Sequence, residues 1–221
     1  MKLLLLVSTV LAAFATNAMA GNAVATPTSP SAPAVVDDWS GSYVGVMGGG
    51  TLVRHKMYVV GFATANESFG IPTLGIFGGY NWQSSNLVYG VDGYIRYRFG
   101  KHTENGIPLA VTMQTQLGLD GSLRGRIGMN MGAFLPYVAA GVTATQLRTF
   151  WPVGSAERDT TVFGGTVGVG ADVKITKNLF VRAEYDFSAY GKKTFSYCVG
   201  GCVMEHKLQT HDFLIGVGYK F

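Results

Sequence analysis

The 221-residue chain has few charged residues, only two cysteines and, beyond its first twenty residues, no long apolar run. No later stretch supplies the roughly 18 apolar residues that a membrane-spanning helix requires. Charged residues make up 14% of the chain, its formal net charge is +4, and no basic run of the nucleic-acid-binding type occurs. We therefore expect neither a helical membrane protein nor a nucleic-acid-binding protein.

The residues that are abundant point to strands. Hydrophobic residues make up 48% of the chain, which contains 31 Gly, 13 Phe, 11 Tyr and 3 Trp. The mean hydropathy is +0.23, which is high for a soluble domain. Hydrophobicity without a spanning helix favours an all-β protein, and the length suits one domain.

The N-terminal region is predicted to be an export signal followed by a tether. Lys2 supplies a positive charge, residues 3–13 are mostly apolar, and Ala18-Met19-Ala20 has the small-x-small pattern of a cleavage site. We predict a signal peptide over 1–20 that is cleaved after Ala20. Residues 21–38, rich in Ala, Pro, Ser and Thr, are predicted to form a flexible segment, and 39–221 the folded domain.

Alternation of apolar and polar residues predicts eight strands. The final stretch, FLIGVGYKF, alternates strictly and ends on the aromatic Phe221. The predicted strands are 42–52, 71–82, 87–98, 113–129, 134–144, 161–175, 179–188 and 211–221.

The two phases of these strands favour a membrane barrel over a soluble sandwich, which also alternates. The apolar phase ends in aromatic residues, as in the girdles of outer-membrane barrels, whereas the polar phase carries glycines and opposed charges that suit a narrow interior. Short connections at 83–86, 130–133 and 176–178 alternate with long ones at 53–70, 99–112, 145–160 and 189–210. Outer-membrane barrels have such short periplasmic turns and long external loops.

The sequence resembles the small outer-membrane β-barrel family of Gram-negative bacteria, which includes OmpA-type transmembrane domains, immunogenic surface antigens and hemin-binding surface proteins. The matching pieces cover nearly all of 39–221 in order. They are DWSGSYVGVMGG (38–49), FGGYNWQ (77–83), VYGVDGYIRY (88–97), GSLRGRIG (121–128), FLPYVAAGV (134–142), TVGVGADV (166–173), FVRAEYDFSAYG (180–191) and the closing GVGYKF.

The resemblance implies an eight-stranded antiparallel up-and-down transmembrane β-barrel in the cell outer membrane, with both chain ends in the periplasm. Its partners would be outer-membrane lipid and lipopolysaccharide. It also implies that the barrel assembly machinery reads the last strand, with Tyr219 and Phe221 as the assembly signal.

Six charged residues fall on the predicted inward phase, and the resemblance to OmpA-type interiors implies that they pair in the lumen. They are Asp92, Arg124, Arg126, Asp172, Arg182 and Glu184. Because side chains fill an eight-stranded barrel, we expect a packed structural interior. A gate in a very narrow pore is the alternative.

Cys198 and Cys202 lie in the last long connection, where an exported chain favours a disulfide. A metal or heme site that includes a nearby histidine and a pair of free thiols are the alternatives. His55, His102 and His206, in or beside the long connections, are weak heme candidates, although polar loops commonly contain histidine.

We expect a structural or surface-antigen role with four external loops, without cofactor, metal or catalysis. One alternative is a surface protein that binds hemin or a host ligand. Another is a lipid-modifying enzyme that uses His211 with Ser188 at adjacent strand tops, although no G-x-S-x-G motif is present.

Overall fold

The computed structural model describes residues 38–59, 65–104, 113–151, 156–191, 193–196 and 203–221. These residues all belong to one compact unit, Val36–Phe221, which is treated by itself below. Every regular element in this part of the chain is a β-strand, and none is a helix long and apolar enough to cross a membrane.

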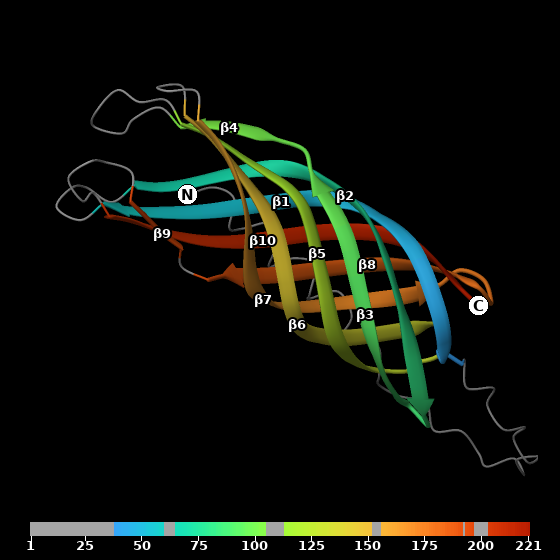
Figure 1. Ribbon diagram of the computed structural model, residues 1–221. Coiled ribbons are helices and arrows are strands. Elements are labelled where there is room, and N and C mark those ends of the chain that lie inside the picture. Colours follow the sequence, from blue (N-terminus) through green and yellow to red (C-terminus); the bar gives the residue numbers. More distant parts are fainter. Residues whose placement is uncertain (1–37, 60–64, 105–112, 152–155, 192, 197–202) are drawn as a thin grey trace, which may run out of the picture. The chain divides into compact units, whose positions relative to one another are not determined.

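Ten strands form one antiparallel sheet (Figure 1). They are β1 (Gly41–Val59), β2 (Ala65–Ser84), β3 (Leu87–Arg98), β4 (Lys101–Glu104), β5 (Met113–Met129), β6 (Phe134–Trp151), β7 (Ala156–Lys174), β8 (Leu179–Tyr190), β9 (Lys193–Ser196) and β10 (Val203–Lys220). The short strands β4 and β9 pair with β5 and β10, so they continue β3 and β8 after brief interruptions.

The sheet closes on itself because β1 pairs with β10, from Tyr43 opposite Lys220 to Val59 opposite Met204. All other pairings join neighbours along the chain. The result is a closed eight-stranded antiparallel up-and-down β-barrel, which confirms the predicted fold class. Closure gives each of the eight barrel strands two hydrogen-bonded neighbours, as a lipid environment requires.

Several strands run further than the sequence pattern predicts. The regions 53–70, 145–160 and 189–210 were expected to be long connections, but β1, β2, β6, β7 and β10 extend well into them. The polar stretches there carry weak alternation, yet their backbone groups still pair with the neighbouring strand. The apolar period of two therefore identifies only the part of a strand that has one side facing lipid. The full length of the strand depends on how far its backbone pairs with the neighbouring strands.

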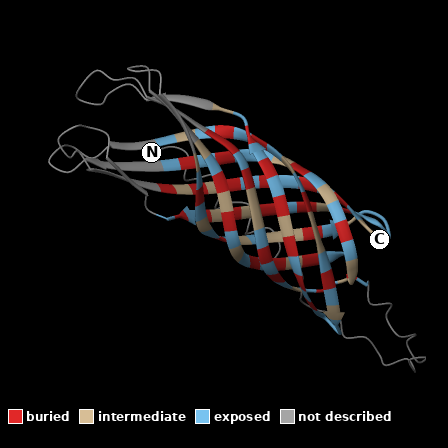
Figure 2. Ribbon diagram, viewed as in Figure 1, coloured by how far each residue is buried: buried red, intermediate tan, exposed pale blue. Residues whose placement is uncertain are grey.

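The two faces of the wall are chemically inverted relative to a soluble protein. Buried and exposed residues alternate along the part of the wall whose burial is described (Figure 2), and β3 follows this pattern along its whole length. The outward face carries large apolar side chains, such as Leu123 at 65% and Ile215 at 67% exposure, whereas Arg96 on the inward face is fully buried. This outward apolar surface is what a bilayer solvates.

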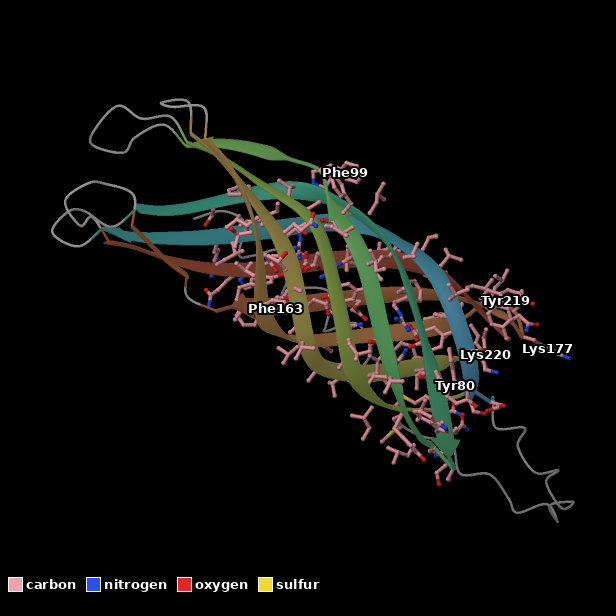
Figure 3. The ribbon with its side chains drawn as sticks, viewed as in Figure 1. Tyr80, Phe99, Phe163, Lys177, Tyr219 and Lys220 are labelled. Carbon is pink, nitrogen blue, oxygen red and sulfur yellow. The ribbon has the colours of Figure 1, made fainter. Side chains whose placement is uncertain are left out.

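Aromatic side chains mark both ends of the apolar surface. At the end with the short turns, the Trp82 and Tyr89 rings stack with centroids 5.9 Å apart, and the Tyr219 and Phe221 rings lie 5.1 Å apart. Toward the other end, Tyr97 and Phe99 form an edge-to-face pair at 4.8 Å. Figure 3 shows Tyr80 and Tyr219 near one end and Phe99 and Phe163 nearer the other. This placement matches the interfacial girdles of membrane barrels.

The interior has three layers. The inward residues of β8 run in the order Phe180, Arg182, Glu184, Asp186, Ser188, Tyr190. Phe180 belongs to an apolar cluster at the short-turn end, with Trp39, Tyr43, Met47, Phe77, Val88, Tyr94, Leu135 and Leu214. Tyr190 belongs to a second cluster with Val53, Ile71, Leu117, Val162 and Leu208. Charged residues occupy the space between the two clusters.

Candidate functional site: the charged interior of the barrel

The middle layer contains five guanidinium and six carboxylate groups, all on buried residues. They come from β3, β5, β7, β8 and β10. The cations are Arg96, Arg98, Arg124, Arg126 and Arg182, and the anions are Asp92, Asp120, Asp172, Glu184, Asp186 and Asp212. Strand alternation explains their shared direction, because residues two apart on one strand face the same side.

Arg124 on β5 connects three carboxylates from two other strands. Its Nε and Nη2 donate to the two oxygens of Asp92 on β3, at 2.9 and 3.1 Å. Its Nη1 donates to Glu184 at 2.9 Å and to Asp186 at 2.7 Å, both on β8. The Tyr137 hydroxyl donates a short hydrogen bond to Glu184. The planar guanidinium suits this arrangement, because its donors point in several fixed directions.

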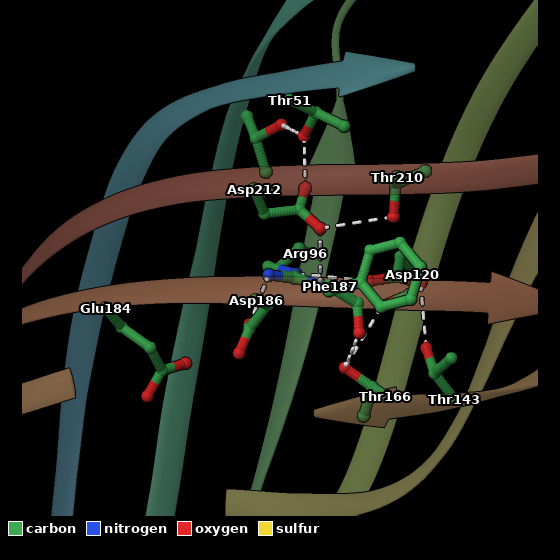
Figure 4. Close-up of polar contacts among 12 residues, drawn as sticks. Thr51, Arg96, Asp120, Thr143, Thr166, Glu184, Asp186, Phe187, Thr210 and Asp212 are labelled. Atoms are coloured by element: carbon green, nitrogen blue, oxygen red, sulfur yellow. Dashed lines mark hydrogen bonds and ion pairs between the residues drawn. The ribbon is translucent and has the colours of Figure 1, made fainter. Parts of the chain in front are cut away.

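A second group lies toward the long-strand end (Figure 4). Arg96 donates to Asp120 at 2.8 Å and to Asp186 at 3.1 Å, so it links this group to the carboxylates around Arg124. Arg98 lies 3.3 Å from both Asp120 and Asp212. Asp212 also accepts a hydrogen bond from Thr51, and the ion pairs therefore connect β3, β5, β8 and β10.

A third group lies next to the apolar cluster at the short-turn end. Asp172 on β7 accepts two hydrogen bonds from Arg182, at 2.7 and 2.9 Å, and one from Arg126, at 2.9 Å. The Arg182 guanidinium lies 4.3 Å from the centre of the Phe77 ring, and that of Arg126 lies 3.8 Å from the Tyr137 ring. Cation–π contacts of this kind offset part of the lost hydration.

Two glycines on β7 make room for these groups. A Cβ at Gly168 would come within 2.3 Å of the Asp186 carboxylate, and one at Gly170 within 2.7 Å of the Tyr137 ring. Either substitution would displace a group that contacts Arg124 or Glu184. The glycines of TVGVGADV therefore fit a crowded interior, in which inward side chains from one wall reach the opposite one.

The arrangement is chemically a packed ionic core. Removing so many charges from water is costly unless each charge is paired and hydrogen-bonded. Here the guanidinium groups donate hydrogen bonds to the carboxylate oxygens. Within the described part of the chain, no group of three or more His, Cys, Asp or Glu residues could hold a metal ion. The geometry is that of a network of ion pairs that cross-links the strands of the wall.

The structure places all six charged residues of the predicted lumen network inside the barrel, and each makes an ion pair with another. The network also includes five residues outside the predicted set, namely Arg96, Arg98, Asp120, Asp186 and Asp212. Arg96, Arg98 and Asp186 share the strand phase of predicted members, so alternation alone could have identified them. Asp120 shares the phase of Arg124 four residues later.

The alternative in which His211 acts with Ser188 at adjacent strand tops does not fit the register of the sheet. Phe187 lies opposite His211, whereas Ser188 lies opposite Thr210 and is fully buried inside the barrel. His211 is on the outward phase, and its Nδ1 lies 2.8 Å from the Tyr185 hydroxyl. The one-residue offset places the two side chains on opposite faces of the wall, where they cannot form a catalytic pair.

Other predicted positions lie wholly or partly outside the described residues. Ala20, Cys198 and Cys202 are not among them. His55, His102 and His206 belong to β1, β4 and β10, but their side chains are outside the described set. The disulfide and the heme candidates therefore stay predictions.

The predicted assembly signal at the end of the chain is described. Tyr219 and Phe221 both face outward, at 44% and 68% exposure. The Phe221 amide donates to the Ser42 carbonyl, so the last residue is held against the start of β1. The location of these rings suits an interfacial anchor, and their role in assembly stays a prediction.

Comparison with known proteins identifies proteins that are similar to this chain. A 25 kDa outer-membrane immunogenic protein of Brucella melitensis is 32% identical, over 100% of this chain and 99% of the relative. A 22 kDa outer membrane protein of Rhizobium leguminosarum bv. viciae is 30% identical, over 83% of this chain and 78% of the relative. Among solved structures, Neisserial surface protein A is 16% identical, with a TM-score of 0.49 over 82% of this chain and 98% of that one.

The family model for the outer membrane protein beta-barrel domain matches residues 6–221. That span includes every strand of the closed sheet and the whole charged interior. The predicted resemblance and the predicted location in the outer membrane are both confirmed. The chain is a member of the outer membrane protein β-barrel domain family, and it resides in the outer membrane.

Proposed function

We propose that this protein is a non-catalytic, structural barrel of the outer membrane that conducts no solute through its interior and displays its long strand ends at the cell surface. The observation that carries this proposal is the ionic layer between the two apolar clusters. Its guanidinium and carboxylate groups pair with one another across the lumen rather than lining an open path.

The orientation follows from the connections. The turns at 85–86, 130–133 and 175–178 follow directly on the apolar belt, whereas at the opposite end β1, β2, β6, β7 and β10 run well past the belt, so that the excursions over 53–70, 145–160 and 189–210 are long. Outer-membrane barrels place short turns in the periplasm and long loops outside. We infer that the short-turn end faces the periplasm, together with residues 21–38 and Phe221.

A surface-antigen role is supported by the relatives. The Brucella melitensis relative is named an immunogenic outer-membrane protein and matches the chain from end to end. In the proposed orientation the distal ends of β1, β2, β6 and β7 extend beyond the apolar belt, and all four connections at this end of the barrel lie on the outer side. Lipopolysaccharide and outer-membrane lipid would surround the belt, and the barrel assembly machinery would act on the C-terminal strand.

Conductance across planar bilayers tests the closed interior. Purified, heat-modifiable protein should give no sustained channel openings. Arg124→Ala, which removes the guanidinium shared by three carboxylates, is the matched variant in which openings are expected to increase if the ionic layer excludes solutes. Long-lived openings in most bilayers containing the unaltered barrel would contradict the proposal.

The orientation and display need a separate measurement. An epitope inserted at 105–112 should be cleaved by protease on intact cells, whereas the same epitope in the turn at 130–133 should be cleaved only after the outer membrane is permeabilised. The second insertion is the control for folding and export. The reverse pattern would contradict the proposed orientation.

A further inference from the structure

The three residues Asp38–Ser40, which we call the mouth strap, lie at the short-turn end of the barrel. They come immediately before the paired part of β1, so the strand ladder does not hold Asp38 and Trp39. Trp39 is nevertheless only 2% exposed and belongs to the apolar cluster inside this end of the barrel. A residue outside the sheet thus completes the interior packing.

The Trp39 ring packs on residues from the far side of the wall. It meets the Phe180 ring of β8 edge to face, with centroids 6.2 Å apart. The Lys174 ammonium at the end of β7 lies 4.7 Å from the indole centre. The indole Nε1 donates to the Gly132 carbonyl, in the turn between β5 and β6, at 3.0 Å. One side chain therefore contacts two hairpins of the barrel, β5–β6 and β7–β8.

The strap backbone is held by side chains of the rim. The Trp39 amide donates to Oε1 of Gln83 at 2.8 Å, and Asn81 donates to the Trp39 carbonyl at 3.3 Å. Lys174 donates to the Asp38 carbonyl at 3.0 Å. These bonds use the ends of β2 and β7, which lie on different hairpins, so the strap spans the mouth rather than following one strand.

Local chemistry bends the chain into this position. The Ser40 hydroxyl and amide both donate to Oδ1 of Asp38, and the hydroxyl bond above all lowers the pKa of that carboxyl. Gly41 has a φ of +116°, and a Cβ there would approach the Phe221 carbonyl at 3.2 Å. Gly132 has a φ of +77°, in the turn that presents its carbonyl to the indole. A glycine suits both positions.

We propose that the mouth strap is a removable closure of the barrel, which seals the short-turn end by inserting Trp39 after the strands have closed. The order follows from the contacts, because β2, the β5–β6 turn, β7 and β8 surround a common mouth only once the sheet is complete. The strap is removable because side-chain contacts hold it, so its departure would unpair no strand of the barrel. Its loss would expose the apolar cluster first and leave the outer cluster covered.

Cysteine labelling tests the closure directly. Val88 is buried in the cluster that contains Trp39, and Val162 is buried in the outer cluster. In a background with Cys198→Ser and Cys202→Ser, Val88→Cys and Val162→Cys are each treated with a water-soluble maleimide in detergent micelles that leave both mouths accessible. We expect both thiols to react slowly while the strap is intact.

Replacing Trp39 should open only the short-turn end of the barrel. Trp39→Ala should raise the labelling rate of Val88→Cys by about tenfold or more, as for a local opening, and leave Val162→Cys unchanged. Fast labelling of Val88→Cys with Trp39 present would overturn the proposal. Unchanged slow labelling in a folded Trp39→Ala barrel would do the same, as would an equal increase at both thiols, which indicates general loosening.

A second variant covers the case in which Trp39→Ala does not give a heat-modifiable barrel. Gln83→Leu combined with Lys174→Met keeps the indole but removes one acceptor and one donor that hold the strap backbone. It should increase labelling of Val88→Cys but not of Val162→Cys. Absence of any increase in this folded double variant would show that the rim contacts do not retain the strap and would overturn the proposal.

Discussion

Replacing Arg124 by Met should destabilise the barrel more than any other single charge removal in its interior. Methionine keeps much of the side-chain length, so the change removes the guanidinium and its bonds to Asp92, Glu184 and Asp186. Three carboxylates then lose a shared cation in a layer that water does not reach.

The expected magnitude is the cost of a stranded buried charge, not a sum over five hydrogen bonds. Each carboxylate keeps one other group nearby: Asp186 still accepts from Arg96 at 3.1 Å, Glu184 accepts from Tyr137, and Asp92 lies 3.7 Å from Arg182. We therefore expect a loss of about 3–5 kcal/mol in the free energy of unfolding, the range for breaking a buried ion pair.

Urea-induced unfolding in lipid vesicles, followed by tryptophan fluorescence and by heat-modifiable gel mobility, measures this loss. Leu123→Met, one residue away on the lipid-facing side, is the matched control and should cost less than about 1.5 kcal/mol. Adding Glu184→Gln to Arg124→Met should cost less than the two single changes summed, with a coupling of about 0.5–3 kcal/mol. A change within about 0.5 kcal/mol for Arg124→Met, the level of an ordinary surface substitution, would refute the reasoning.

Three further predictions concern other parts of the chain. Ala183→Arg should cost about 2–4 kcal/mol in vesicles, because Ala183 faces hydrocarbon, whereas its neighbour Arg182 should tolerate Lys better than Met, since Lys keeps the charge; equal tolerance of Ala183→Arg and Arg182→Lys would contradict the assignment of faces. Deleting Phe221 should sharply reduce the amount of heat-modifiable protein in the outer membrane without reducing export, and normal amounts would count against an assembly role. Mass spectrometry of protein isolated from cells should find a disulfide between Cys198 and Cys202, and two free thiols would contradict that prediction.

Much of the fold was predictable because the solvent on each face of the wall imposes a period of two. Lipid outside and packed charge inside require opposite residue types on alternate positions, so the pattern of β3 and the central part of β5 reveals both a strand and its faces. The alternating pattern is lost where the two faces of the wall no longer differ in polarity. For this reason the sequence predicts a connection where the distal parts of β1 and β2 lie.

Strict alternation also fails at an irregularity. The register between β5 and β6 shifts between Leu117 and Asp120, and both residues are buried although they are three apart. A bulge changes which residues face inward without changing composition, so counting by twos from Asp120 would put Leu117 on the wrong face. Similarly, His211 and Ser188 lie near each other along the sheet but on opposite faces, which only the register between β8 and β10 decides.

By itself the sequence determined the strand phases, the inward charges and the aromatic ends of the belt, because each is a property of neighbouring residues. Only the tertiary structure decided which charges meet and what closes the mouth. Arg124 joins Glu184, sixty positions away, because barrel closure brings opposite walls within reach of one guanidinium. Trp39 reaches Gly132 for the same reason. Such contacts depend on register and barrel diameter, which arise from pairing all the strands together and are not encoded in any one of them.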